Sequence, residues 1–290
     1  MQEKIIIYTS ITGGYDPLQQ PFPVPEGMDI EFLCFVRKGT KTTEYDGLWR
    51  IEEIPFDWDD QMLLSRYPKM NPQSALPEDC NWSLWIDGNV QITGPEIYRR
   101  CIELQEAGVR YAGVSHPDTD CVYEEAIRCM ERRKEKFIPL MRLVHFLRKN
   151  GLPEHSGVME NNLIFRKHND PDVVEFDRWW WECFLKYPKR DQMTHSFCML
   201  DTPSLQCGYI FPEGVSTKNS PGLKRTEHPR PPKTWYERKI LYQQNAPLRL
   251  LLRIYIKLTG LFYSKRDIRL PRPAAAGSPE ARTDCVKKEL

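Results

Sequence analysis

The sequence lacks several patterns that would assign it to a well-defined class. It contains no run of about 20 apolar residues, the length that a membrane-spanning helix needs. It has neither a G-x-G-x-x-G pattern nor a Walker A pattern, which are the usual fingerprints of dinucleotide and P-loop sites. Its 41 Lys and Arg residues nearly balance 40 Asp and Glu residues, so the formal net charge is only +1. Since no overall positive field favours nucleic acid, we expect no nucleic-acid partner.

The cysteines show no pattern of pairing or metal binding. There are nine of them, an odd number, and no CxxC pair occurs. A chain of 290 residues can bury a core without disulfide bonds, so free thiols in a reducing compartment are expected. The apolar run at residues 5–8 is too short for the hydrophobic region of a secretory signal. We therefore expect a cytoplasmic protein.

The first two-thirds of the chain alternate between strand and helix patterns. Apolar runs predict strands at residues 4–10, 30–36, 48–54, 82–86, 111–115 and 158–166. Periodic apolar positions predict helices at 61–76, 95–108, 127–149, 173–187 and 193–200, and Pro68 predicts a break or kink in the first of them. Such alternation is typical of an α/β fold, so we expect a mixed, mostly parallel sheet flanked by helices over residues 1–212.

The remainder of the chain differs in composition. Residues 213–234 are rich in Pro, Gly, Lys and Arg, which indicates a loop or lid. Residues 235–268 predict a basic amphipathic helical segment, with Arg249, Arg253 and Lys257 spaced as one stripe beside apolar residues. This pattern suits an anionic membrane surface, with the protein bound peripherally, but helix packing onto the domain or a partner explains it equally well. We expect residues 269–290 to form a disordered tail.

The stretch at residues 81–92 is the one around which the chain is organised. Trp82, Leu84 and Ile86 predict a buried strand that ends in Asp87-Gly88-Asn89. A carboxylate and an amide oxygen two residues apart can both face one hard cation, Mg²⁺ or Mn²⁺, which would hold a diphosphate. A plain tight turn accounts for the same residues, because Asp-Gly and Gly-Asn are also hairpin signals.

Two further patterns are typical of phosphate binding. The first predicted strand runs into a turn containing Gly13 and Gly14, where backbone N–H groups face a ligand in many α/β sheets. Arg66 and Lys69 are three residues apart and share one helical face, where they can meet a diphosphate. An ordinary turn and a solvated helix face are the plain alternatives.

Polar clusters at the ends of later elements are candidates for a cleft. Glu160, Asn161 and Asn162 lie at the entry of a predicted strand, where polar groups are unusual for an interior. Asp191 and Gln192 open a predicted helix, where an acid and an amide can bind a ligand or simply serve as good first-turn residues.

Three other polar residues carry weaker signals. We expect Asp120 to cap the helix that contains Glu124. His228 is a lone histidine in the basic loop; simple exposure is the plain reading, and we keep it as a candidate third metal ligand.

Taken together, six segments resemble a known family, the glycosyltransferase-like domain shared by bacterial polysaccharide-cluster proteins and plant mucilage-type glycosyltransferases. They occur in the family's order and span roughly residues 4–200. The segments are YTSITGGYD (8–16), SRYPK (65–69), SLWIDGN (83–89), HP with DCVYEEA (116–117 and 120–126), ENN (160–162) and RDQ (190–192).

The resemblance implies a GT-A type fold, a Rossmann-like sheet that binds a nucleotide-sugar with Mn²⁺ or Mg²⁺ held by a DxD-like element. Asp87 falls on the first acid of that element, and Asn89 replaces the second. The family has Phe-Thr-Asp after its second strand, whereas this chain has Phe35-Val36-Arg37, so its contact to the base differs. The remaining positions implied to contact donor or acceptor are Thr9, Gly13, Gly14, Tyr15 and Asp16 by the nucleotide, Arg66 and Lys69 by the diphosphate, and Asp191 and Gln192 by the sugar.

The leading hypothesis is a glycosyltransferase that moves a sugar from a nucleotide-sugar to a glycan or lipid-linked acceptor in polysaccharide biosynthesis. Asp191 is the candidate carboxylate that accepts the acceptor's proton or steadies the developing cation, with Glu160 and Glu124 behind it. The alternative is a catalytically silent domain that binds a nucleotide-sugar or glycan, because the second acid of the DxD-like element is missing. A hydrolase is the weakest hypothesis, since no G-x-S-x-G elbow occurs.

Overall fold

The computed structural model describes residues 3–14, 16–188, 190–226, 234–235, 245–271 and 273–274. Tyr15, His228 and most of the expected tail therefore lie outside the described residues.

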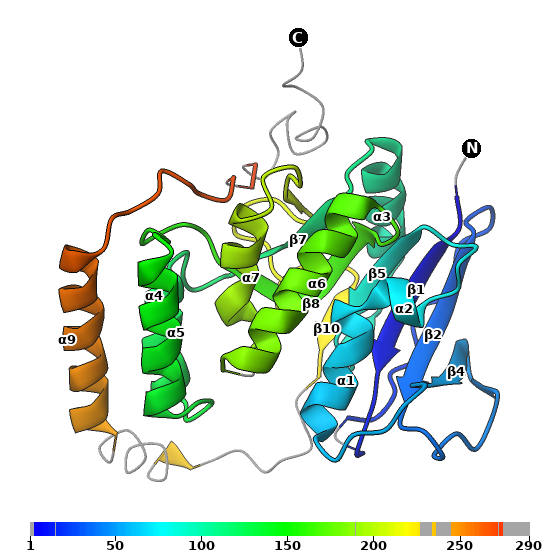
Figure 1. Ribbon diagram of the computed structural model, residues 1–290. Coiled ribbons are helices and arrows are strands. Elements are labelled where there is room, and N and C mark those ends of the chain that lie inside the picture. The colour runs from blue at the N-terminus through cyan, green and yellow to red at the C-terminus, as the bar shows by residue number, and fades with distance from the viewer. Residues whose placement is uncertain are drawn as a thin grey trace.

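The described chain is built on an eight-stranded sheet with the order β3-β4-β2-β1-β5-β8-β7-β9 (Figure 1). In this part of the chain, four neighbouring pairs are parallel and three are antiparallel. The expected α/β class with a mixed, mostly parallel sheet is thus confirmed. The strands are β1 (Ile5–Ser10), β2 (Ile30–Val36), β3 (Tyr45–Asp46), β4 (Trp49–Glu53), β5 (Trp82–Ile86), β7 (Tyr111–Ser115), β8 (Met159–Lys167) and β9 (Gly208–Tyr209).

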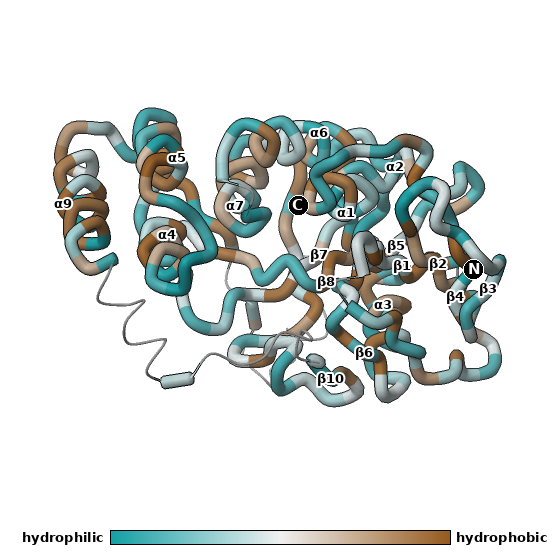
Figure 2. The backbone as a smooth tube through the Cα atoms, turned by 90° about the horizontal axis from the view of Figure 1, so that it is seen from below, coloured by the Kyte–Doolittle hydropathy of each residue, from teal (hydrophilic) through white to brown (hydrophobic). Residues whose placement is uncertain are grey.

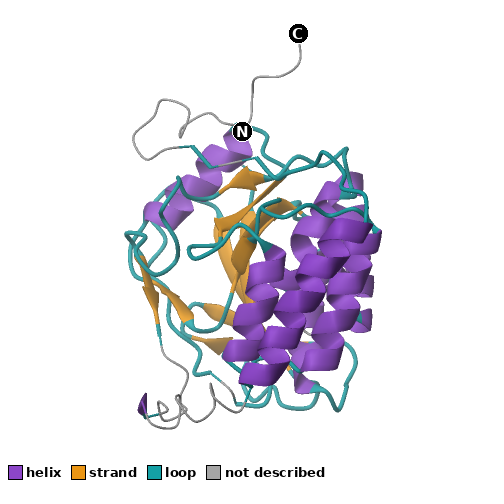
Figure 3. Ribbon diagram, turned by 90° about the vertical axis from the view of Figure 1, so that its left-hand side faces the viewer, coloured by secondary structure: helices purple, strands orange, loops and turns teal. Residues whose placement is uncertain are grey.

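The central strands are buried on both faces, which explains their continuous apolar runs. Side chains alternate along β1, so Ile5 and Ile7 pack with one apolar cluster while Ile6 and Tyr8 pack with another. The first cluster includes α3 (Glu96–Glu106). The second includes a larger group of helices gathered on the other side of the sheet (Figure 3). That group comprises α1 (Gln61–Met70), α4 (Val122–Glu131), α5 (Phe137–Lys149), α6 (Pro171–Lys186) and α7 (Gln192–Leu200).

Two expectations about helix breaks are wrong. Pro68 does not break α1, which continues to Met70, and the chain turns only at Asn71, ahead of the short helix α2 (Pro72–Ala75); of the predicted break or kink, the break is therefore wrong. Residues 127–149 do not form one helix, because α4 ends at Glu131 and α5 begins at Phe137.

Two described segments after residue 212 pack onto the rest of the domain. β10 (Leu223–Arg225) pairs antiparallel with β6 (Val90–Ile92), which directly follows the Asp87-Gly88-Asn89 turn. Further on, α9 (Ala246–Phe262) packs against α4 and α5 through Leu252 and Ile256. No helix within the described ranges combines the length and the apolar character that crossing a bilayer requires.

The predicted basic stripe on α9 needs correction. Arg253 and Lys257 are exposed, but Arg249 is buried at 4% exposure and belongs to the packed face of the helix. The outward face of α9 is instead largely apolar, and Figure 2 shows the helix at the edge of the molecule beside α4 and α5.

Candidate active site

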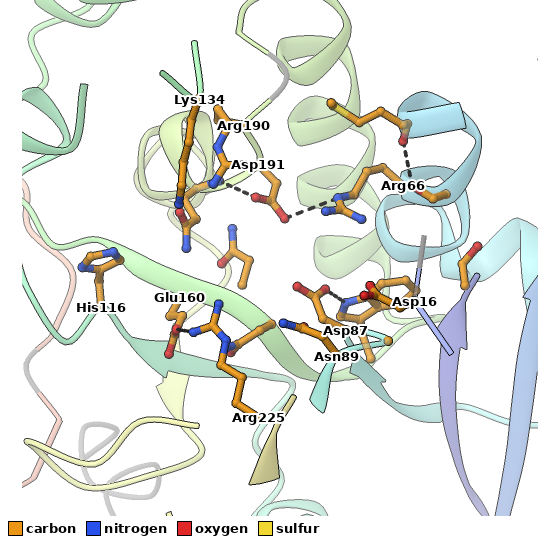
Figure 4. A pocket seen from close by; sticks show the side chains of 18 of the residues that line it. Asp16, Arg66, Asp87, Asn89, His116, Lys134, Glu160, Arg190, Asp191 and Arg225 are labelled. Carbon is orange, nitrogen blue, oxygen red and sulfur yellow. Dashed lines mark hydrogen bonds and ion pairs between the residues drawn. The ribbon is translucent and has the colours of Figure 1, made fainter. Parts of the chain in front are cut away.

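The site lies where the strand order reverses. From β1 the chain passes to β2 on one side, whereas β5, which comes later, pairs with β1 on the other side. The loops that follow β1 and β5 therefore leave the same edge of the sheet in opposite directions, and ligands of open α/β sheets bind in the crevice between such loops. An open pocket of about 1110 Å³ lies here, and Thr12, Asp16, Asp87 and Asn89 line it (Figure 4).

Strand β8 brings further polar groups to the pocket. It runs antiparallel to β5, so its first residues lie beside the end of β5, and the Asp87 N–H donates to the Asn162 carbonyl at 2.9 Å. Glu160 is only 5% exposed and accepts a hydrogen bond from Arg225 at 3.0 Å. The Asn162 amide donates to the Thr217 hydroxyl at 2.6 Å. The polar residues at the strand entry thus form a hydrogen-bonded wall of the pocket.

A buried lysine connects the two carboxylates that sequence patterns singled out. The ammonium Nζ of Lys69 lies 3.2 Å from Asp87 Oδ1 and 2.5 Å from Asp191 Oδ2. Its side chain is fully buried and lies 5.4 Å from the centre of the Trp85 ring. The Trp85 indole also donates to Asp87 Oδ1 at 2.8 Å. Lys69 is therefore behind the carboxylates, whereas Arg66, 3.9 Å from Asp191, lines the pocket. Both cations approach Asp191 Oδ2, as expected for residues on one helix face, but the alternative of an ordinary solvated face is wrong for Lys69, which is fully buried between the two acids.

Asp191 is held in its ionised form. Burial favours the neutral acid, but the charges of Lys69, Arg66 and Arg190 outweigh burial and hold the pKa of Asp191 well below its usual range. The carboxylate also accepts a hydrogen bond from the Gln192 N–H at 3.0 Å, as the N-cap of α7. A carboxylate of such low basicity is a weak proton acceptor and is better suited to stabilising positive charge.

The described residues do not by themselves make a metal site. Among them, no group of three or more His, Cys, Asp or Glu side chains is placed to hold an ion. Asp87 Oδ1 is shared between Lys69 and Trp85, and the Asn89 amide donates to the Thr226 carbonyl at 3.4 Å. Mg²⁺ prefers six oxygen ligands, so one engaged carboxylate and one amide are a poor donor set. The Mn²⁺ or Mg²⁺ site at Asp87, Asn89 and His228 stays a prediction.

The glycine turn after β1 is shaped by backbone geometry. Gly13 and Gly14 have φ of 69° and 63°, a region that glycine enters far more readily than other residues. The Thr12 hydroxyl donates to the Gln61 carbonyl at 3.1 Å, which ties the turn to α1. Thr9, predicted to contact the nucleotide, is 1% exposed within the sheet, whereas Asp16 reaches the pocket wall.

The expected helix cap and one of the reserve catalytic acids need correction. The N-cap residue of α4 is Cys121, and Asp120 instead lies 2.6 Å from His155 Nδ1. Glu124 is exposed and does not line the pocket, whereas its neighbour Glu125 does.

Several residues of the pocket wall were given no role from sequence. His116 Nε2 lies 3.8 Å from Glu125 Oε2, and burial lowers the pKa of His116 despite the opposing charge of Glu125. Both belong to segments that carry the family resemblance, which was the available signal. Lys134, on the loop between α4 and α5, and Arg225, at the end of β10, also line the pocket, but no sequence motif marks either of them.

A second buried ion pair supports the pocket from outside. Arg166 donates to Asp177 at 2.5 Å and to the Tyr8 hydroxyl at 2.9 Å, and it also donates to the backbone carbonyl of Lys69. Arg166 and Asp177 are both 0% exposed. This network joins β1, β8 and α6 to the turn of α1 from which the Lys69 side chain extends.

With this geometry in hand, comparison with known proteins defines the class. The family model of the TOD1/MUCI70 glycosyltransferase-like domain matches residues 1–206, and the chain belongs to this family. Membership in it supports a role in glycosyl transfer. No curated protein matches the chain at a significant level.

The solved structures that match this chain are distant in sequence, and their TM-scores are all below 0.5. Mouse xyloside xylosyltransferase 1 in its apo form has a TM-score of 0.43 and 7% identity, covering 72% of this chain and 85% of its own. The galactosyltransferase LgtC with donor and acceptor sugar analogues has a TM-score of 0.41 and 9% identity, covering 85% and 95%. The 4-diphosphocytidyl-2C-methyl-D-erythritol synthase of Anaerococcus prevotii has a TM-score of 0.36 and 11% identity, covering 84% and 97%.

Proposed function

We propose that this protein transfers a sugar from a nucleotide-sugar donor to a glycan or lipid-linked acceptor in polysaccharide biosynthesis. One observation carries the proposal most directly. Asp87 and Asp191, from distant parts of the chain, face one pocket at the β1–β5 switch point and are joined by the buried Lys69. Family membership supports the same reaction class.

The reaction breaks the bond between the anomeric carbon and the diphosphate and forms a bond from that carbon to an acceptor oxygen, whose proton passes to the departing diphosphate or to water. The diphosphate leaves with negative charge, and Arg66 is the cation in the pocket wall beside Asp191 that can stabilise it. The sugar gains positive charge in the transition state, and the ionised Asp191 can stabilise that charge. We assign Gln192 and Glu160, which line the same pocket, to hydrogen bonds with the sugar and acceptor.

A silent binding domain is the second candidate, and a specific observation favours it. Asn89 stands where the second acid of a DxD-like element is expected, and its amide is directed to a backbone carbonyl. Such a domain would bind a nucleotide-sugar or glycan in the same pocket without turnover, so detectable transfer with any donor would eliminate it.

We also propose peripheral association with an anionic membrane on the cytoplasmic side, through the outward face of α9. No acidic residue occurs in this helix, and Arg253 and Lys257 are exposed on it. An apolar face flanked by cations binds anionic lipid surfaces. The exposed apolar side chains are Leu248, Leu250, Leu251, Ile254, Leu258, Leu261 and Phe262.

A thermal-shift panel tests the donor assignment. Nucleoside diphosphates and nucleotide-sugars are added to wild type and to Asp87→Ala, with and without Mn²⁺, since a ligand that binds only the folded state raises the Tm. A shift that needs both Mn²⁺ and Asp87 establishes a metal-bridged donor. A rise in Tm that does not need Mn²⁺ indicates that cationic side chains of the pocket, such as Arg66, bind the diphosphate without a metal ion. The absence of any shift would refute nucleotide-sugar binding.

A further inference from the structure

The pocket continues past Asp191 to a second group of cations. There the loop between α4 and α5 contributes Arg132 and Lys134 to the wall, and Arg190 precedes α7. Figure 4 shows Lys134 and Arg190 side by side, both extending into the pocket, on the opposite side of Asp191 from Arg66. The pocket thus has one end beside Asp16 and Asp87 and another end beside these two cations.

The backbone at the end of α4 fixes the position of Lys134. The Lys134 N–H donates to the Cys129 carbonyl at 2.8 Å, and the Arg133 N–H donates to the Met130 carbonyl at 3.1 Å. These two bonds define a Schellman motif, which normally has glycine at the position that Arg133 occupies with φ of 51°. Lys134 is therefore held at a capped helix end, with its side chain directed to the pocket.

These three cations are only partly balanced by the carboxylates around them. Arg132 lies 3.8 Å from Asp118, and the charge of Glu125 acts on Lys134, but Lys134 forms no ion pair with a carboxylate among the described residues. Although Lys134 is exposed overall, partial desolvation of its ammonium group and the like charge of Arg190 lower the pKa of Lys134. The buried Arg190 Nε has no hydrogen-bond partner among the described residues.

The acid nearest to Arg190 is already shared. Asp191 interacts with Lys69 and Arg66 as well as with Arg190, while Asp87 pairs with Lys69. Positive charge is consequently in excess at this end of the pocket. Cations that repel each other in a cleft are stabilised when an anion binds between them.

We propose that Lys134 and Arg190 bind a phosphate group carried by the acceptor, and that the acceptor is lipid-linked. This proposal rests on the proposed function, which assigns the donor diphosphate to the opposite end of the pocket. The neighbouring helix supports the lipid source: Arg253 of α9 lies 3.2 Å from Glu131, the last residue of α4, three residues before Lys134. The apolar face proposed to meet the membrane thus belongs to the helix that packs against α4, and the Lys134 loop follows the end of α4.

Titration calorimetry with three probes tests the subsite. The probes are a short-chain prenyl phosphate, a hexose phosphate and a nucleoside diphosphate, each added to wild type, Lys134→Gln and Arg190→Gln. Lys136→Gln is the matched control, because Lys136 is an exposed cation on the same loop and does not line the pocket. We expect each pocket variant to weaken prenyl phosphate binding at least tenfold and to leave the Kd for nucleoside diphosphate within threefold. The control leaves both unchanged.

The outcomes separate this proposal from the one on which it rests. If prenyl phosphate and nucleoside diphosphate compete, and Lys134→Gln weakens the affinity for both equally, these cations bind the donor. That result would overturn the subsite. Binding of hexose phosphate as tight as that of prenyl phosphate would overturn the lipid source. Failure of wild type to bind either phosphate probe would overturn the subsite itself. If wild type binds prenyl phosphate but binds no nucleoside diphosphate, the proposed donor is wrong and the subsite is supported.

Discussion

Replacing Lys69 with methionine tests the link between the two carboxylates most sharply. Methionine fills nearly the same volume and removes the charge that lies between Asp87 and Asp191. Breaking one partner of a fully buried ion pair costs about 3–5 kcal/mol. Asp87 is 26% exposed in its side chain and Asp191 retains Arg66, so solvent and the remaining cation reduce this cost. We expect a loss of about 2–3 kcal/mol in the free energy of unfolding at pH 7, measured by urea denaturation.

The pH dependence of that loss identifies its cause. The pKa of Asp191 is depressed in the folded protein, so its contribution to stability is present above the unfolded pKa and is lost as pH falls through the folded pKa. Without Lys69 the pKa of Asp191 is lowered less than in wild type. Asp191 therefore becomes protonated at a higher pH in the variant, and protonation removes the buried charge that has lost its partner. The difference in stability between wild type and Lys69→Met should therefore stay constant from pH 7 to about pH 4 and shrink as pH falls further, through the folded pKa of Asp191 in the variant.

A double variant supplies the internal control. Asp191→Asn in the Lys69→Met background removes the charge left without its partner, so the double variant should be more stable than the sum of the single losses. Lys136→Met, an exposed site, should change stability by less than about 0.5 kcal/mol. A Lys69→Met protein as stable as wild type, or a difference that does not shrink as pH falls below about 4, would refute the reasoning.

Three further predictions follow from the same structure. Arg166→Met should lower the free energy of unfolding by about 3–5 kcal/mol in urea titrations, because it leaves the fully buried Asp177 without its partner; a change below about 1 kcal/mol would contradict that role. Gly13→Ala should lower the free energy of unfolding by about 1–2 kcal/mol, because the φ of Gly13 is 69°, and it should weaken nucleotide binding. Unchanged stability and nucleotide affinity would contradict this prediction. Ile254→Glu should reduce pelleting with anionic liposomes, with an unaffected far-ultraviolet circular dichroism spectrum as control, and unchanged pelleting would exclude α9 as the membrane face.

The sheet was largely predictable because its strands are buried on both faces. Runs such as Ile5-Ile6-Ile7-Tyr8 are too apolar for any exposed element and too short for a helix between turn residues. The split between α4 and α5 was not predictable from propensity. The residue with positive φ there is Arg133, where glycine is the usual signal of a helix end.

The site was predictable only where a motif marked it. Asp87 and Asp191 were singled out by their positions at element ends, and both face the pocket. Their joint pairing with Lys69 had no signal, because the lysine and Asp191 are separated by 122 positions in sequence. Lys134 lies in a run of charged residues that is typical of a solvated surface and is indeed exposed, and the hydrogen bonds that close the end of α4 place it at the pocket.

Turnover of a nucleotide-sugar by wild type and Asp191→Asn is the measurement that tests the central claim most directly. Asparagine keeps the N-cap of α7 and removes only the charge. The account predicts that wild type releases the nucleoside diphosphate from its donor, whereas the variant binds that donor within a few-fold of the wild-type Kd but turns it over at least about 100-fold more slowly, a loss of about 2.7 kcal/mol in transition-state stabilisation. Equal turnover by both proteins would contradict it.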